Sequence, residues 1–280
     1  MPKTIKQTLL DATTQLQHRS DTARLDAEVL LAHVLHKTRT WLMTWPEHSL
    51  TAAEKSEFDD LLRQRIEGKP IAYLIGQQEF WSLKLKVNEH TLIPRPETEC
   101  LVEQALSLIP PDAKFEIADL GTGSGAIALA LAKERPDCHI TAIEQSAKAM
   151  AVAQENAKTL GLLNVSFSQA NWLEGIGQDR FDIILSNPPY IESCDPHLQQ
   201  GDVRFEPVTA LQSGAEGLDD IQQIIVQAKN CLKPFGWLLI EHGYTQQQQV
   251  LTLLQRHGFQ NTLGYKDYAG QARFVVAQKP

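Results

Sequence analysis

The residues most suited to chemistry are four consecutive ones, Asn187-Pro188-Pro189-Tyr190, which directly follow the apolar segment 181–186. The two prolines stiffen the backbone, so the Asn187 side-chain oxygen and the Pro188 carbonyl can act as two fixed acceptors. Tyr190 adds a flat aromatic face. Two acceptors beside a ring suit a planar, conjugated –NH₂ group, which is either a carboxamide or the exocyclic amine of a base. We therefore predict that this segment binds such a group and carries the catalytic residues.

A planar amino nitrogen is a poor nucleophile because its lone pair is delocalised into the neighbouring C=O or ring. When the protein accepts both N–H bonds, the nitrogen shifts towards a pyramidal geometry and its lone pair turns to an electrophile. No strong base is needed before the attack, since the nitrogen becomes acidic only after it is alkylated. Positioning of this kind can supply roughly 7–11 kcal/mol of a barrier. The segment thus predicts group transfer to nitrogen.

A second candidate site is the turn Gly121-Thr122-Gly123-Ser124-Gly125, which lies between a predicted strand and a predicted helix. Glycines let a ligand approach the backbone, and the helix N-terminus presents free N–H groups to it. The dinucleotide fingerprint requires Gly-x-Gly-x-x-Gly, but here Ala126 stands at the third glycine. This spacing disfavours NAD and favours a nucleotide-type ligand without a pyrophosphate. Glu144 ends the next predicted strand, where its carboxylate can accept two hydrogen bonds from a ribose diol.

The elements that must position these residues alternate between strands and helices from residue 98 onward. The predicted strands are 115–120, 139–143, 165–168, 181–186, 237–241, 258–264 and 273–277. Helical segments between the early strands favour a mostly parallel sheet with helices on both faces, which is an α/β fold. The last two strands are too close for a crossover helix, so we expect them to be antiparallel. Open sheets of this kind bind ligands at the carboxyl ends of their strands.

The chain before this sheet divides into two parts. Apolar residues recur at helical spacing, so we predict a small helical bundle over residues 1–75. Partial alternation then predicts a β-hairpin linker over 76–95, followed by the α/β domain over 96–280. Residues 191–218 are rich in glycine, proline and polar residues and have no clear period. We expect this long loop to be functional.

Composition excludes several classes of protein. The 280 residues are 42% hydrophobic and 21% charged, which is typical of a globular chain and not of a disordered or fibrous one. The longest apolar run, 126–132, is far shorter than the ~20 residues of a membrane helix, and no signal peptide is visible. We therefore expect a cytoplasmic protein without a membrane partner.

Charge and metal-binding residue types narrow the function further. The net charge is −8, and the acidic excess lies after residue 86. Because sequence-independent nucleic-acid binding rests on Lys and Arg, this balance disfavours nucleic acid as the main partner. The 4 cysteines form no Cys-x-x-Cys pair, and the 9 histidines form no His-x-x-x-His pair. We predict scattered reduced thiols and no metal site.

The glycine turn and the Asn-Pro-Pro-Tyr segment together resemble those of class I S-adenosylmethionine-dependent methyltransferases that act on planar amino groups. Further segments occur in the same order in the PrmC/HemK family, the release factor glutamine N5-methyltransferases. These segments are Leu92-Ile93-Pro94-Arg95-Pro96-Glu97-Thr98-Glu99, Asp202-Val203-Arg204-Phe205-Glu206-Pro207 and Glu241-His242-Gly243. The resemblance covers the chain from about residue 70 to the end. It implies a Rossmann-like domain with a seven-stranded, mostly parallel sheet and an antiparallel last strand.

The resemblance also implies a cofactor, S-adenosyl-L-methionine, and residues that hold it. Its methionine part would lie on the backbone of Gly121, Thr122, Gly123, Ser124 and Gly125. Glu144 would hold the ribose hydroxyls, and Trp172 would flank the adenine. Many relatives carry Asp where Asn171 stands; the Asn oxygen can still accept from the adenine amine, but without charge assistance. Asn187 is counted among the cofactor-binding residues as well.

The substrate implied by the resemblance is the Gly-Gly-Gln loop of class-1 peptide chain release factors. Asn187 and Pro188 would hold the glutamine amide, with Pro189 and Tyr190 beside it. The enzyme would methylate the N5 amide nitrogen and so aid translation termination. The helical residues 1–75 would grip the rest of the release factor, and the acidic charge after residue 86 would attract a cationic factor. We expect a monomer, and we assign no role to His242.

Other functions remain open. An adenine-N6 methyltransferase on DNA or RNA would use the same four residues to hold a flipped base. It would need a basic groove, and the acidic balance and the lack of a Lys/Arg cluster argue against one. A non-catalytic binding module on the same fold should have lost either the glycine turn or the Asn-Pro-Pro-Tyr segment, yet both are present. An NAD-dependent oxidoreductase is disfavoured by the glycine spacing.

Overall fold

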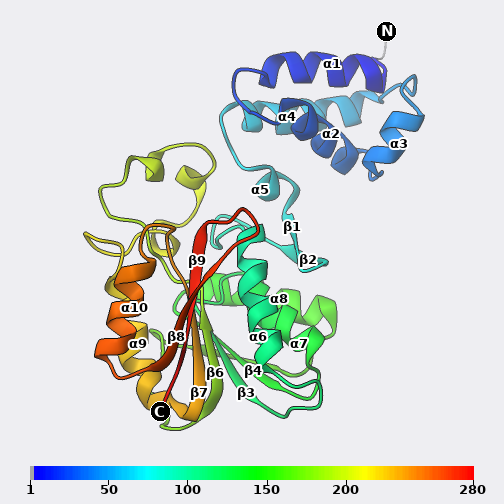
Figure 1. Ribbon diagram of the computed structural model, residues 1–280. Coiled ribbons are helices and arrows are strands. Elements are labelled where there is room, and N and C mark those ends of the chain that lie inside the picture. The colour runs from blue at the N-terminus through cyan, green and yellow to red at the C-terminus, as the bar shows by residue number, and fades with distance from the viewer. Residues whose placement is uncertain (1–2) are drawn as a thin grey trace. The chain divides into compact units, whose positions relative to one another are not determined.

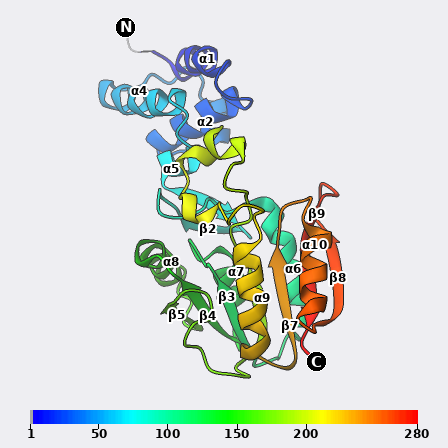
Figure 2. The same ribbon diagram turned by 90° about the vertical axis from the view of Figure 1, so that its left-hand side faces the viewer.

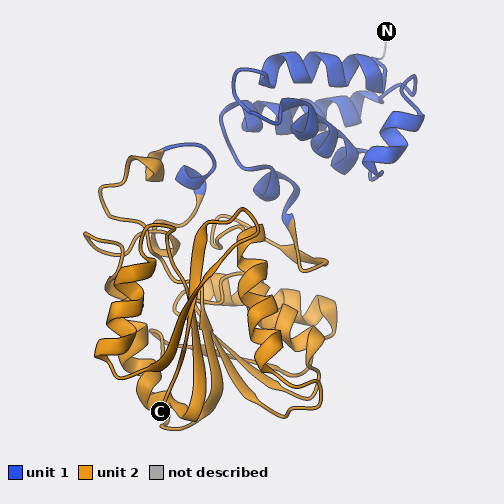
Figure 3. Ribbon diagram, in the orientation of Figure 1, with its two compact units in different colours: residues 1–77, 200–205 blue, residues 78–199, 206–280 orange. Residues whose placement is uncertain are grey.

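The computed structural model describes residues 3–280. They form two compact units, coloured separately in Figure 3. The first contains the described residues up to 77 together with 200–205, and the second contains 78–199 and 206–280. No helix among the residues that the structure describes is long and apolar enough to span a membrane.

The first unit is helical (Figure 1). Its helices are α1 (Ile5–Leu16), α2 (Ala23–Val34), α3 (Arg39–Thr44), α4 (Ala52–Ile66) and α5 (Ile71–Ile75). Capping boxes start two of them, because Thr4 and Thr51 each accept the backbone N–H three residues later while that residue's side chain bonds back. The helices bury one apolar cluster, in which Leu16, Leu30 and Phe58 are fully enclosed.

Residues 200–205 belong to this unit through a buried cation. Arg65 donates to Asp26 at 2.7 Å and to Asp202 at 2.8 Å. The side chains of Arg65 and Asp26 are only 10% and 7% exposed. A buried pair of this kind is costly to break, because removing one partner leaves the other charge uncompensated. Residues 200–205, in the middle of the long loop, are thus anchored to α4.

A two-stranded sheet, β1 (Gln77–Phe80) and β2 (Leu83–Lys86), begins at the boundary between the units, and the second unit also contains a separate seven-stranded sheet. The strands of the larger sheet, in spatial order, are β5 (Val165–Gln169), β4 (His139–Glu144), β3 (Glu116–Leu120), β6 (Phe181–Ser186), β7 (Leu232–Glu241), β9 (Ala272–Gln278) and β8 (Gln260–Lys266). The pairs from β5 to β7 are parallel, and β9 is antiparallel to both neighbours. The predicted α/β fold and its antiparallel last pair are confirmed.

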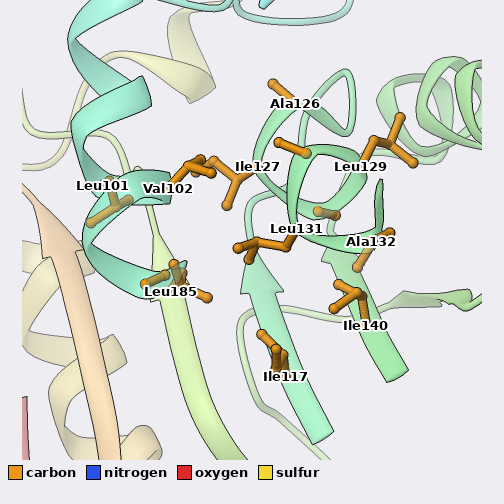
Figure 4. Packing of buried hydrophobic residues seen from close by; sticks show 14 of the residues in the cluster. Leu101, Val102, Ile117, Ala126, Ile127, Leu129, Leu131, Ala132, Ile140 and Leu185 are labelled. Carbon is orange, nitrogen blue, oxygen red and sulfur yellow. The ribbon is translucent and has the colours of Figure 1, made fainter. Parts of the chain in front are cut away.

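Helices cover both faces of this sheet. They are α6 (Glu99–Leu108), α7 (Ala126–Glu134), α8 (Ala147–Leu160), α9 (Asp219–Cys231) and α10 (Gln247–Arg256). Figure 1 and Figure 2 show α6, α7 and α8 on one face and α9 and α10 on the other. Side chains of a strand alternate between faces, so successive residues of β6 enter different clusters. Leu185 packs on the α6–α7 side, in the cluster that Figure 4 shows, and Ile184 on the α9–α10 side.

Two predicted segments, 237–241 and 191–218, differ most from the structure, and the strand predicted over 258–264 runs from Gln260 to Lys266. The strand expected over 237–241 begins five residues earlier, at Leu232, and runs through Pro234 and Gly236. The long loop over 191–218 is not featureless, because it contains short 3₁₀ turns, η2 (Pro196–Gln199), η3 (Val203–Phe205) and η4 (Val208–Ala210). An isolated parallel bridge between Ile191 and Gln212 joins the two ends of this loop to each other.

Candidate functional site

A cavity of about 430 Å³ lies beyond the carboxyl ends of β3, β4 and β6, within the second unit. This volume is within the range of small-molecule sites. The predicted site residues that line it are Gly121, Gly123, Glu144, Asn171, Trp172, Asn187 and Pro189. The cavity therefore joins both sequence motifs at the sheet edge where open α/β folds bind ligands.

Other predicted residues support this cavity without lining it. Thr122, Ser124, Gly125 and Pro188 are buried and adjoin lining residues in the chain, and Tyr190 is partly buried against the α9–α10 cluster. The Ser124 carbonyl, for example, accepts the Asn156 side-chain amide at 2.8 Å. Residues to which sequence reasoning gave no role also line the cavity, notably 89–92, Pro207, Thr209 and Ala210.

The glycine turn is held by backbone bonds and by a buried carboxyl. The amides of Gly121 and Thr122 both donate to the Ile143 carbonyl, at 2.9 and 3.0 Å. Asp119 accepts from the Thr122 hydroxyl at 2.6 Å and from the Ala128 amide at 3.1 Å. Burial raises the pKa of Asp119 to about 6, since its charged form is poorly solvated there. The turn is thereby fixed between β3 and the start of α7.

The Trp172 ring covers the start of this turn. A Cβ added to Gly121 would lie 3.1 Å from the ring, and Gly121 has a φ of +69°, so a side chain there would be both crowded and strained. The indole N–H of Trp172 donates to Asp220 at 3.2 Å, which fixes the ring plane. Next to it, the Asn171 amide nitrogen donates to Glu174 at 3.0 Å. The Asn171 oxygen is the atom left to accept a further hydrogen bond.

Glu144 is held by two backbone donors. One carboxylate oxygen accepts the Gly123 amide and the other accepts the Ser146 amide, each at 2.9 Å. An ionised carboxylate has about four acceptor sites, so each oxygen can still take one more donor. Glu144 lines the cavity, and it is therefore set to accept a pair of hydroxyls.

The Asn-Pro-Pro-Tyr segment follows β6 directly. The last residue of the strand, Ser186, donates to the Leu120 carbonyl at 2.9 Å and so ties the ends of β6 and β3 together. The side-chain nitrogen of Asn187 donates to the Thr98 hydroxyl at 3.1 Å. Because a carboxamide presents nitrogen and oxygen on opposite sides, this bond leaves the Asn187 oxygen as the acceptor for a ligand.

Glu241, at the end of β7, lies behind Asn187 and Tyr190. It accepts the Thr98 hydroxyl at 2.7 Å and the Tyr190 hydroxyl at 3.3 Å. Burial raises the pKa of Glu241 to about 7, although Arg273 and the two hydroxyls favour the charged form. The pKa of Tyr190 is raised as well, first by burial and then by the Glu241 charge. Two titratable groups, Glu241 and Tyr190, are thus hydrogen-bonded to each other, and Glu241 is linked to Asn187 through Thr98.

Sequence reasoning missed Thr98, Asp119, Asp220 and Glu241. Thr98 and Glu241 stand in segments that the family resemblance marks, and this signal could have directed attention to them. Asp220 carries no such signal, since it reads as one of the acidic residues that open α9. His242, to which no role was assigned, is buried with its Nδ1 2.8 Å from the Gly243 carbonyl, and burial lowers its pKa. Among residues 3–280, no group of three or more His, Cys, Asp or Glu could hold a metal ion.

The fold and this cavity have clear counterparts among known proteins. A family described as a methyltransferase domain matches residues 111–268. Among solved structures, a methyltransferase from Pyrococcus furiosus aligns with a TM-score of 0.55 at 16% identity, covering 79% of this chain and 98% of that one. A ribosomal protein L11 methylase from Lactobacillus delbrueckii subsp. bulgaricus aligns with a TM-score of 0.51 at 20% identity, covering 70% and 86%. The chain is therefore a class I methyltransferase that uses S-adenosylmethionine.

Similarity over the whole chain narrows this class to one family. A family described as the PrmC N-terminal domain matches residues 7–76. The release factor glutamine methyltransferase of Salmonella typhimurium is 48% identical over 270 residues, which is 96% of this chain and 97% of that protein. Those of Escherichia coli and Vibrio cholerae are 47% and 48% identical, over 96% and 99% of this chain and 97% and 98% of theirs. The chain belongs to the release factor glutamine methyltransferase family, which confirms the resemblance seen in the sequence.

The residues of the cavity fit the cofactor of this class. Gly121 and Gly123 line the cavity with backbone at φ values of +69° and +57° that favour glycine, and Glu144 retains acceptor capacity on both oxygens. Trp172 offers an aromatic surface held in place by Asp220. An adenosine-containing ligand requires these three features: an accessible backbone, an acceptor for the ribose diol and an aromatic surface for the base.

Proposed function

We propose that the chain transfers the methyl group of S-adenosyl-L-methionine to the N5 amide nitrogen of the glutamine in the Gly-Gly-Gln motif of class-1 peptide chain release factors. The names of relatives that match nearly the full chain support this substrate. The observation that carries the chemistry is the orientation of Asn187. Its nitrogen is bonded to Thr98, so its oxygen is the atom that can accept an N–H bond from a planar amide.

The cofactor would be held by the residues that form the first half of the cavity. Gly121 and Gly123 would contact its methionine part, Glu144 would accept the ribose hydroxyls, and Trp172 would flank the adenine, with Asn171 as an acceptor for the adenine amine. Thr122, Ser124 and Gly125 would act by shaping the turn. When bound, S-adenosylmethionine supplies an electrophilic methyl group.

The chain's own contribution to catalysis would be to orient the glutamine amide. The Asn187 oxygen and the Pro188 carbonyl would accept its two N–H bonds, and this geometry turns the nitrogen lone pair out of conjugation. Pro189 lines the cavity and keeps the segment rigid, and Tyr190 lies beside it. Because the amide nitrogen becomes positively charged when it takes the methyl group from sulfur, it then releases a proton readily to water, and the reaction needs positioning rather than a strong base.

We further propose that the helical residues 1–75 bind the body of the release factor, with residues 76–95 as the linker to the catalytic residues 96–280. Exposed apolar side chains support a protein-binding role for the helical unit, since Met43 and Trp45 at the end of α3 are 61% and 56% exposed. The enzyme would work in the cytoplasm as a monomer. The net charge of −8 supports a cationic protein partner over DNA or RNA.

A labelling experiment tests this function against adenine methylation. Each reaction contains the chain, S-adenosylmethionine with a labelled methyl group, and one acceptor. The four acceptors are a class-1 release factor, the same factor with the motif glutamine replaced by glutamate, DNA, and RNA. We expect label only on the unaltered factor. Label on nucleic acid, or equal label on the glutamate variant, would refute the proposal.

A further inference from the structure

Asn187 is the end of a hydrogen-bonded series that begins at a buried carboxyl. Glu241 accepts from the Thr98 hydroxyl at 2.7 Å, and the Thr98 hydroxyl accepts from the Asn187 amide at 3.1 Å. Glu241 and Thr98 are 1% and 3% exposed, so water does not compete at either residue. Neither residue lines the cavity. The three side chains come from β7, η1 (Pro96–Thr98) and the segment after β6.

The direction of each bond in this series follows from the first acceptor. An ionised carboxylate only accepts hydrogen bonds, so Thr98 must use its single proton on Glu241. The Thr98 oxygen can then only accept, and only the –NH₂ side of the Asn187 amide can face it. The Asn187 oxygen is thereby held on the opposite side, where the substrate nitrogen must lie if the proposed function is right.

We propose that Thr98 and Glu241 are positioning residues that hold the Asn187 carboxamide with its oxygen towards the amino group to be methylated. This inference rests on the proposed function, because it explains how the chain selects one of two amide orientations that have nearly the same shape. The wrong orientation would present two N–H donors to a substrate that is itself a donor.

The second oxygen of Glu241 and its charged neighbours support the ionised state. Tyr190 donates its hydroxyl to that oxygen at 3.3 Å, and Arg273 of β9 acts on the same carboxyl with a favourable charge, whereas Glu97 of η1 opposes it. Burial works in the other direction and raises the pKa of Glu241 to about 7. A protonated Glu241 would donate to Thr98 and free the hydroxyl proton for the Asn187 oxygen. Protonation would therefore remove the selection of orientation.

A pair of substitutions at Thr98 separates positioning from packing. Thr98→Val keeps the size and shape of the side chain but has no hydroxyl, whereas Thr98→Ser keeps the hydroxyl and loses a methyl group. In the full chain acting on a class-1 release factor, we expect Thr98→Val to lower kcat roughly 10–100-fold, the usual scale for an orienting partner. Thr98→Ser should stay within about threefold of the wild-type kcat, and the Kd for S-adenosylhomocysteine should stay within about twofold in both. Equal kcat values for the two variants would overturn the inference.

The pH profile provides a second test that does not depend on Thr98. The wild-type kcat should rise between about pH 6 and pH 8 with a midpoint near the pKa of Glu241, because only the ionised carboxyl fixes Asn187. Glu241→Gln should have a low kcat and lack this rise, since its amide can face Thr98 with either its oxygen or its nitrogen. An unchanged acidic limb in Glu241→Gln would contradict the inference.

A measurement without turnover separates this inference from the proposed function. The side-chain –NH₂ signals of Asn187 in ¹⁵N-labelled protein should titrate with Glu241 in the wild type and show no such titration in Glu241→Gln. Asn187 –NH₂ chemical shifts that do not change with pH over this range would overturn the positioning role, even if the enzyme methylates release factors. Conversely, titrating signals in a protein that transfers no methyl group to glutamine would leave the positioning role supported and refute the proposed function.

Discussion

Replacing Glu144 by glutamine should weaken cofactor binding far more than its small change in size suggests. The two carboxylate oxygens accept the Gly123 and Ser146 amides at 2.9 Å each. Glutamine has one oxygen and one –NH₂ group, so it can accept only one of these donors, and its nitrogen would face the other. The ribose hydroxyls would lose at least one charged acceptor, and the turn would lose the bond that fixes Gly123.

The size of this effect follows from the number of bonds affected. A hydrogen bond to a charged group contributes about 1.5–3 kcal/mol. Losing one such bond to the ribose corresponds to roughly a 10–100-fold increase in Kd, since each 1.4 kcal/mol is a factor of ten. Relaxation of the Gly123 turn would place Glu144→Gln towards the upper end. Glu144→Asp keeps both acceptors on a side chain one methylene shorter, so it should increase Kd by less than Glu144→Gln.

Calorimetric titration of S-adenosylhomocysteine into the wild type and both variants measures these Kd values directly, without any protein substrate. A thermal unfolding curve for each variant serves as the control for folding. If Glu144→Gln bound the product as tightly as the wild type, Glu144 would not hold the ribose. If Glu144→Asp were weaker than Glu144→Gln, charge would not be the property that matters.

Other substitutions test separate parts of the account. Asn187→Ala should lower kcat by about 10²–10³, the scale of losing one preorganised hydrogen-bonding group, and leave the fold and the binding of S-adenosylhomocysteine largely intact. Gly125→Ala should lower the free energy of unfolding by about 1–3 kcal/mol in denaturant titrations, because this residue has a φ of +88° and an added Cβ would meet side-chain carbon at 2.9 Å. Arg65→Met should lower it by about 3–5 kcal/mol, because Asp26 would be left as an unpaired buried charge, and Asp26→Asn in the same background should recover part of the loss. In the same denaturant titrations, Glu241→Gln should become more stable relative to the wild type as the pH rises from about 5 to 8. Burial raises the pKa of Glu241 to about 7, so the folded wild type keeps a proton that the unfolded chain releases. Once both states are ionised, the free energy of unfolding of the wild type is lower by on the order of 3 kcal/mol.

Much of the fold follows from local patterns in the sequence. Short apolar runs ending in Leu120 and Ser186 predict buried parallel strands, and the structure contains both. Strand β7 begins at Leu232, earlier than expected. Pro234 and Gly236 indicated a break in the sequence, but they lie in a register shift between the Phe181–Leu232 and Ile183–Trp237 pairs, where a strand tolerates such residues. The spatial order of the strands depends on tertiary packing, which no local pattern records.

In the site, too, residues within one local motif could be predicted from the sequence, whereas contacts between residues far apart in the chain could not. Asn187 could be found from the sequence because two rigid prolines follow a polar side chain at a strand end, and it does line the cavity. The glycine-rich pattern of the turn did not show which of its residues face the cavity: Gly123 lines it and Ser124 does not. Thr98 and Glu241 are 143 positions apart, so their hydrogen bond is invisible until the chain is folded.

The atom that receives the methyl group is the central point of the proposed function. Tandem mass spectrometry of a class-1 release factor, after incubation with this chain and S-adenosylmethionine, locates the modification on a single residue. We predict one added methyl group on the side-chain nitrogen of the glutamine in Gly-Gly-Gln, and none when the chain carries Asn187→Ala at short reaction times. A methyl group on another residue of the factor, or a fully active Asn187→Ala variant, would contradict the account.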